Sequence, residues 1–194
     1  MNPTLTPSAW PQSLSASING LRESAERART AYQGADAAAE TLRADAAAAE
    51  KSAEGPLAAT VVYDGYIRRQ YATVLNEIAF SHAGTALSLS RVWHRAAYAY
   101  AYGVASTFAD LQQHRRPELA YVAYDQAAPA PSKSAPEDLR SAYRSACDAH
   151  LRIDRGAQPY GREPWATSAE QWHLYAELVG CQVLAELGAQ AVKQ

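Results

Sequence analysis

Hydrophobic positions in the first part of the chain follow one regular pattern. From Leu14 to Ala53, apolar and small residues recur at alternating intervals of four and three without a slip. A sustained period of about 3.5 residues keeps such side chains on one face of a gently supercoiled helix. The pattern therefore predicts a long, coiled-coil-like N-terminal helix over about residues 12–54, which Gly55-Pro56 ends. We call its recurring positions the alanine seam: Leu14, Ile18, Leu21, Ala25, Ala28, Tyr32, Ala35, Ala39, Leu42, Ala46, Ala49 and Ala53.

The next segment, residues 57–116, carries bulkier side chains in two helical stripes. Both stripes have the spacing of a helix face that packs on a core. The run Ala83-Gly84-Thr85 lies between them and predicts a break, so we expect a helical hairpin or a kinked helix. The alternating sequence YAYAYG at 98–103 lies inside this helical period and is therefore assigned to helix. The first stripe is Ile67, Tyr71, Val74, Ile78 and His82, and the second is Leu89, Trp93, Ala96, Tyr100, Val104 and Leu111.

Two capping boxes predict where the remaining helices begin. In each, a Ser or Thr stands three residues before a Glu, so the two side chains can satisfy free backbone N–H groups at a helix start. Ser134-Ala-Pro-Glu137 predicts a helix over 137–155, and Thr167-Ser-Ala-Glu170 predicts one over 167–188.

Two further segments are rich in proline. Residues 1–12 hold three prolines without any period and predict a flexible arm. Residues 125–136 (DQAAPAPSKSAP) predict a mobile Pro/Ala-rich linker. The chain is therefore expected to form a single all-α domain over 1–194, an elongated helical bundle of four to five helices.

Composition supports a folded helical chain without pointing to a chemistry. Alanine contributes 43 of the 194 residues, and the formal charge of -2 is too small for a charge-driven disordered chain. No run approaches the roughly 20 apolar residues of a membrane span, so no membrane partner is expected. The two cysteines, Cys147 and Cys181, are too few for a disulfide scaffold, which favours a cytoplasmic location.

Histidine and glutamate suggest one possible metal site. Glu170-Gln-Trp-His173 has the spacing found in di-metal helical bundles, although the chain holds no second Glu-x-x-His. His82, His150 and His173 stand on three expected helices and can converge as a three-histidine site. The plainer interpretation places His82 and His150 at the core or its boundary and leaves His173 exposed. The sequence lacks hydrolase, P-loop and dinucleotide-binding motifs, so we predict no cofactor and favour a non-enzyme.

The middle of the chain is basic. Residues 67–116 contain six arginines and only two carboxylates, and aromatic residues lie between the arginines. Arginine binds phosphate in a bidentate manner and aromatic rings stack on unpaired bases, so nucleic-acid binding is one hypothesis. The plainer alternative is a solvated face that pairs with acidic helices. The arginines are Arg68, Arg69, Arg91, Arg95, Arg115 and Arg116.

The length of the alanine seam leads to the favoured functional hypothesis. Short helices cannot cover it, so either the 57–116 helices run beside it or a second copy of the chain does. We therefore expect a non-enzymatic protein that acts by association as a homo-oligomer and uses the apolar and alanine faces of the long helix for assembly. The alternatives are a nucleic-acid-binding protein and a metal-binding bundle enzyme.

Overall fold

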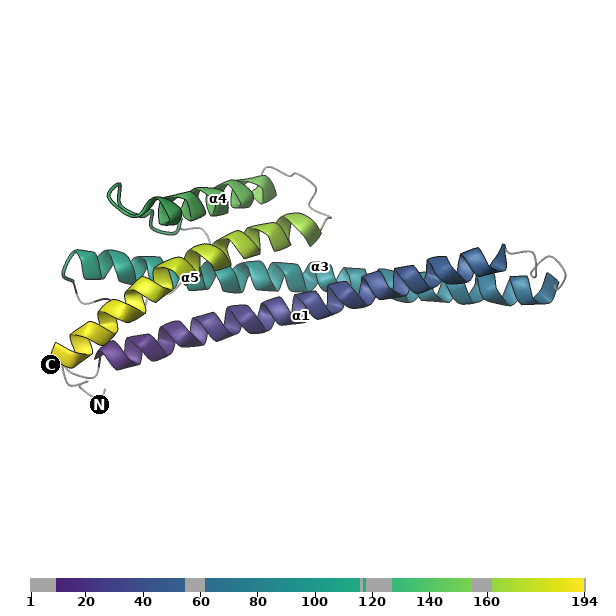
Figure 1. Cartoon of the computed structure of the whole chain (residues 1–194), viewed down its shortest axis with the longest axis horizontal. Coiled ribbons are helices and arrows are strands. Elements are labelled where there is room, and N and C mark those ends of the chain that lie inside the picture. The colour runs from purple at the N-terminus through teal and green to yellow at the C-terminus, as the bar shows by residue number, and fades with distance from the viewer. Residues whose placement is uncertain (1–9, 55–61, 116, 118–126, 155–161, 194) are drawn as a thin grey trace. The chain divides into compact units, whose positions relative to one another are not determined.

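The computed structural model confirms the all-α helical bundle. Within the residues that it describes, the chain forms four α-helices and no strand (Figure 1). The described residues are 10–54, 62–115, 117, 127–154 and 162–193. The helices are α1 (Trp10–Ala53), α3 (Val62–Gln112), α4 (Glu137–Asp154) and α5 (Arg162–Lys193).

Helix α1 confirms the alanine seam. Every seam residue is buried or half-buried, and Ile18, Ala25, Ala39, Ala46 and Ala53 are at most 3% exposed. These five are separated by multiples of seven residues, or two helical turns, and therefore share one line along the helix. The helix begins at Trp10, so it includes the last residues of the segment 1–12 that was expected to be an arm. The rest of that arm, residues 1–9, lies outside the described part of the chain.

Helix α3 corrects the prediction of a break at Ala83-Gly84-Thr85. One continuous helix runs through this point, so neither a hairpin nor an interruption exists there. A glycine inside a helix costs only about 1 kcal/mol relative to alanine. The Ser88 hydroxyl donates to the Gly84 carbonyl, and Ala83 and Ala86 beside it favour helix. Residues 98–103 are helical, as predicted.

The described residues gather into two compact units, and α1 and α3 contribute to both. We call Arg29–Leu89 the hairpin unit, because the end of α1 and the start of α3 run side by side in opposite directions there (Figure 1). The Asn76 side-chain amide donates to the Glu50 carboxylate at 3.4 Å across this pair. The remainder is the four-helix unit. The expectation of one domain over 1–194 stays a prediction.

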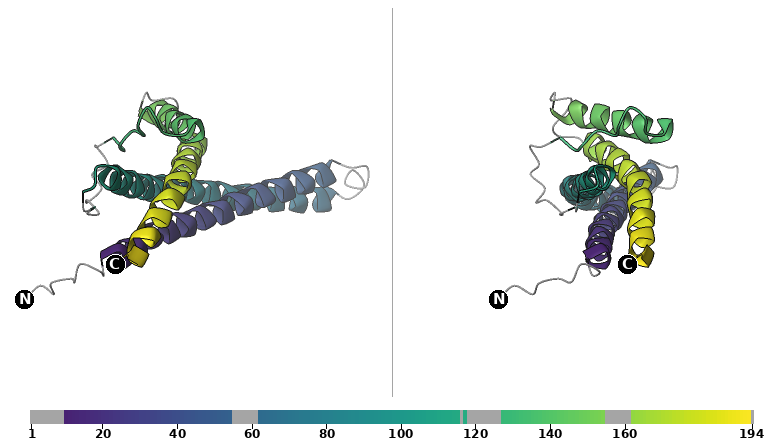
Figure 2. Two further views of the ribbon diagram at one scale, coloured as in Figure 1. Left: turned by 60° about the vertical axis from the view of Figure 1, so that its left-hand side comes forward. Right: turned by 90° about the vertical axis from the view of Figure 1, so that its left-hand side faces the viewer.

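Within the four-helix unit, α4 lies against the first part of α5, and the C-terminal end of α5 lies beside the start of α1 (Figure 2). Helices α3 and α5 approach closely at Gly180, where an added Cβ would stand 2.6 Å from the Tyr100 hydroxyl. The core here is aromatic. Its largest buried side chains include Tyr100, Tyr175 and Leu139.

The segment before α4 lies against this core. Among the linker residues, 127–136 are described and are not helical. The Tyr143 hydroxyl donates to the carbonyl of Ala128 at 3.0 Å, and the Tyr175 hydroxyl donates to the carbonyl of Pro129 at 3.2 Å. Two aromatic side chains of α4 and α5 therefore anchor the segment through its backbone.

Helix α5 begins earlier than the second capping box predicted. It starts at Arg162, so Thr167 and Glu170 lie inside the helix and do not mark its start. Pro164 explains the difference, because proline is tolerated in the first turn of a helix, where its missing N–H has no intrahelical partner. Glu163 in that turn also suits the positive end of the helix dipole.

Candidate association surface

The bulky stripe at the start of α3 faces solvent. Ile67, Tyr71, Val74 and Ile78 are 46%, 58%, 49% and 42% exposed, so the prediction that they face a core is wrong. We call these four residues the exposed stripe. Their intervals of four, three and four residues keep them on one face of the helix.

The buried face of α3 carries small residues, unlike the exposed stripe. Ala72, Ala79 and Ala86 are at most 1% exposed, and they are seven residues apart, like the alanines of the seam. Two helices approach most closely where both present small side chains, because nothing bulky separates their backbones. In the described part of the hairpin unit these alanines of α3 are buried together with Leu75, whereas the four residues of the exposed stripe are left outside the contact.

This arrangement also changes which surface is available for assembly. The alanine seam was expected to carry it, but its residues are buried or half-buried within their own chain. An aromatic side chain such as that of Tyr71 covers about 150–250 Å², and isoleucine and valine are smaller. The exposed stripe therefore leaves open on the order of 400 Å², which is the size of the largest apolar patch on an ordinary monomer, and such patches are often functional.

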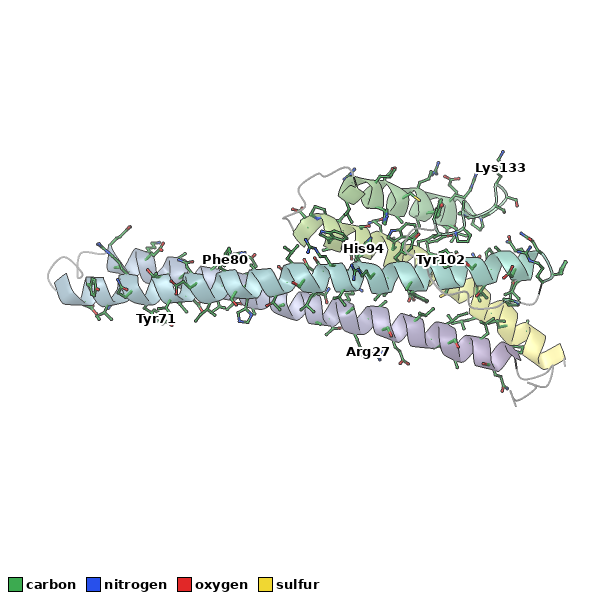
Figure 3. The ribbon with its side chains drawn as sticks, turned by 180° about the vertical axis from the view of Figure 1, so that it is seen from behind. Arg27, Tyr71, Phe80, His94, Tyr102 and Lys133 are labelled. Atoms are coloured by element: carbon green, nitrogen blue, oxygen red, sulfur yellow. The ribbon has the colours of Figure 1, made fainter. Side chains whose placement is uncertain are left out.

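Other exposed groups stand on the same part of α3, outside the exposed stripe. Tyr66 and Phe80 are 59% and 82% exposed, and Figure 3 shows Tyr71 and Phe80 on different sides of α3. Asp64 and Arg68 form an ion pair at 2.9 Å, one turn apart. The charges of Asp64 and Arg68 cancel beside the exposed stripe, Glu77 adds one negative charge on its other flank, and Arg69 stands on the opposite side of the helix.

His150 pairs with a histidine that the sequence analysis did not select. The His94 Nε2 and His150 Nδ1 atoms are 3.2 Å apart, and the two rings stack with centroids 5.2 Å apart. The edge of Trp165 and the ring of Tyr98 complete the surroundings of His94. His94 is 4% exposed, and this burial lowers its pKa to about 4, with further lowering from His150 and Arg95. The pair links α3 to α4.

His173 is buried, so the expectation that it is exposed is wrong. It is 6% exposed, and its Nε2 lies 2.9 Å from a Glu26 carboxylate oxygen and 3.8 Å from one of Glu177. Arg22 holds Glu177 from the other side through two hydrogen bonds of 2.8 and 2.7 Å. Burial raises the pKa of Tyr100, and the Glu177 carboxylate raises it further. These polar side chains join α1, α3 and α5 at one place.

The predicted metal ligands have separate partners. His150 pairs with His94, His173 pairs with Glu26, and Glu170 is exposed on α5. His82 is half-buried and belongs to the hairpin unit. In the described ranges, no three His, Cys, Asp or Glu side chains are grouped so that they could hold a metal ion. The metal-binding bundle stays a prediction that these contacts do not support.

The candidate nucleic-acid residues are mostly engaged with other groups. Arg68 pairs with Asp64, Arg115 pairs with Asp110 at 2.6 Å, and the guanidinium of Arg91 lies 5.5 Å from the centre of the Trp165 ring. Arg95 also interacts with a neighbouring group, and Arg69 is exposed. Arg116 lies outside the described residues. Arg68 and Arg69 belong to the hairpin unit and the other described arginines to the four-helix unit, so nucleic-acid binding stays a prediction.

Comparisons with known proteins add nothing to this geometry. No family model, curated protein or solved structure matches the chain. None of the helices in the described part is both long and apolar enough to cross a membrane.

Proposed function

We propose that this protein acts by association, as a non-enzymatic cytoplasmic helical protein that docks a helix of a partner on the exposed stripe. The observation that carries the proposal is the exposure of Ile67, Tyr71, Val74 and Ile78 on a helix that buries its alanines. Bulky apolar side chains at intervals of four and three fit a second helix that runs along them. The cytoplasmic location rests on the small number of cysteines.

Covering the exposed stripe removes on the order of 400 Å² of this chain's surface from water, and a similar area of the partner's. Buried area does not convert directly into affinity, because association also costs about 4–15 kcal/mol in lost motion, before side-chain ordering is counted. A contact of this size belongs with the weak, reversible interfaces.

A solvent-sensitive fluorophore tests whether the exposed stripe is covered. We would replace Cys147 and Cys181 with alanine, introduce Val74→Cys, and attach the fluorophore there. The matched control carries the same label at Thr73, which is exposed next to Val74 but outside the exposed stripe. Emission is recorded for the purified chain over a concentration series and for dilute chain added to an extract of cells that produce the protein.

The proposal predicts a blue shift at position 74 in at least one of these conditions, because a docked helix removes water from the label. The control at position 73 should keep the emission of a label in water. A label at position 74 that stays fully hydrated in both the concentrated chain and the extract contradicts the proposal.

A further inference from the structure

The residue spacing of the exposed stripe is the same in both directions along the helix. We infer that its occupant is a second copy of this chain, bound antiparallel about a two-fold axis. This inference rests on the proposed function, because it names the partner of the same surface. Isologous pairing of one patch with its own copy is the commonest way in which soluble chains associate.

The spacing of the exposed stripe is the same in both directions along the helix. Its intervals are four, three and four residues, so an antiparallel copy meets it without any slip in register. A two-fold axis at the midpoint places Ile67 opposite the partner's Ile78 and Tyr71 opposite the partner's Val74. Four layers of side chains then form along about 16 Å of helix.

Side-chain size favours the antiparallel arrangement over the parallel one. In the antiparallel pair, two layers match a large Tyr71 with a small Val74, and the other two match isoleucine with isoleucine. A parallel pair would place Tyr71 against its own copy and Val74 against its own copy, which gives one crowded and one hollow layer. Interfaces that alternate large and small side chains fill space without strain.

Charge opposes the contact only weakly. Beside the exposed stripe the charges of Asp64 and Arg68 cancel and Glu77 leaves one negative charge on each copy, which is largely screened at physiological ionic strength. Each copy keeps its own Asp64–Arg68 ion pair. The exposed stripes of both copies together supply roughly 800 Å², which is below the range of about 1,200–2,000 Å² for stable specific interfaces, so the dimer should be weak and should form reversibly as concentration rises.

Cysteine pairing tests both the partner and its direction. In a background with Cys147→Ala and Cys181→Ala, we would prepare Ile67→Cys and Ile78→Cys as separate chains and oxidise each one alone and both mixed. Within an antiparallel pair, two copies of position 67 stand about 16 Å apart. A disulfide needs Cβ atoms about 3.5–4.5 Å apart, so only the mixture should form a covalent dimer.

Light scattering of the wild-type chain provides the independent measurement. Its mean mass should rise with concentration, and Val74→Glu should weaken the dimer at least tenfold because it buries a carboxylate in the contact. Thr73→Glu adds the same charge outside the exposed stripe and should leave the dimer unchanged. Oxidation is carried out at a concentration at which the wild type is dimeric.

Two results would overturn the inference. Covalent dimers of Ile67→Cys alone would show a parallel pair or another contact. A wild-type chain that stays monomeric up to millimolar concentration has no second copy on the exposed stripe. In that second case the proposed function survives if the label at position 74 is covered in the cell extract, and fails with the inference if it is not.

Discussion

Acidification should destabilise the four-helix unit through His94. This side chain is 4% exposed, and its pKa is about 4 in the folded chain against 6.5 for an ordinary histidine. Between these two values the unfolded chain binds a proton that the folded chain does not. The contribution of His94 is therefore fully present above pH 6.5 and is lost as the pH falls toward 4.

The size of the effect follows from the difference between the two pKa values. One unit corresponds to about 1.4 kcal/mol, so the full loss is roughly 3 kcal/mol. Integration from pH 7 to pH 5 gives about 2 kcal/mol of that loss. This is a large part of the stability of an ordinary domain, and urea unfolding measures it well.

The assay compares the free energy of unfolding at pH 7 and pH 5 for three chains. The wild type should lose about 2 kcal/mol more than His94→Gln, which cannot take up the proton. The control, His114→Gln, removes an exposed histidine and should behave as the wild type does. Equal losses in the wild type and in His94→Gln would refute the assignment of the pH dependence to His94.

Two further predictions concern packing. Ala46→Leu should lower stability by about 1–3 kcal/mol in urea unfolding, because Ala46 is 1% exposed and the added atoms overfill the contact, whereas exposed Ala47→Leu should change it little. An unchanged Ala46→Leu chain would mean that the alanine faces are loosely packed. Gly180→Ala should lower the melting temperature, since its Cβ would stand 2.6 Å from the Tyr100 hydroxyl; Gly188→Ala, with nothing within 4 Å, should be neutral or stabilising. A Gly180→Ala chain as stable as the wild type would contradict that close approach.

The sequence was sufficient to predict the buried face of α1, because a single face of that helix is covered. The residues of the alanine seam share one face from Leu14 to Ala53, so periodicity alone found the buried side. Helix α3 offers two candidate faces near its start, one bulky and one of alanine. Hydrophobicity favours the bulky face, but the alanines of α1 select the small one. That choice depends on the partner helix and cannot be read from α3 alone.

The histidines illustrate the same limit at the candidate sites. His173 is buried because Glu26, from a helix far away in the sequence, lies against it, and no local pattern announces that contact. His94 escaped notice because it stands beside the apolar stripe that contains Trp93. It is buried all the same, since α4 and α5 cover a second face of α3.

Thiol accessibility at two neighbouring positions tests most directly which face of α3 is turned outward. We would introduce Val74→Cys and Leu75→Cys separately, with Cys147 and Cys181 replaced by alanine, and measure labelling rates in dilute, monomeric protein. Val74 is 49% exposed and Leu75 is 7% exposed. Position 74 should therefore react at nearly the rate of a free thiol, and position 75 at least tenfold more slowly. Faster labelling at position 75 than at position 74 would contradict the exposed stripe and the association built on it.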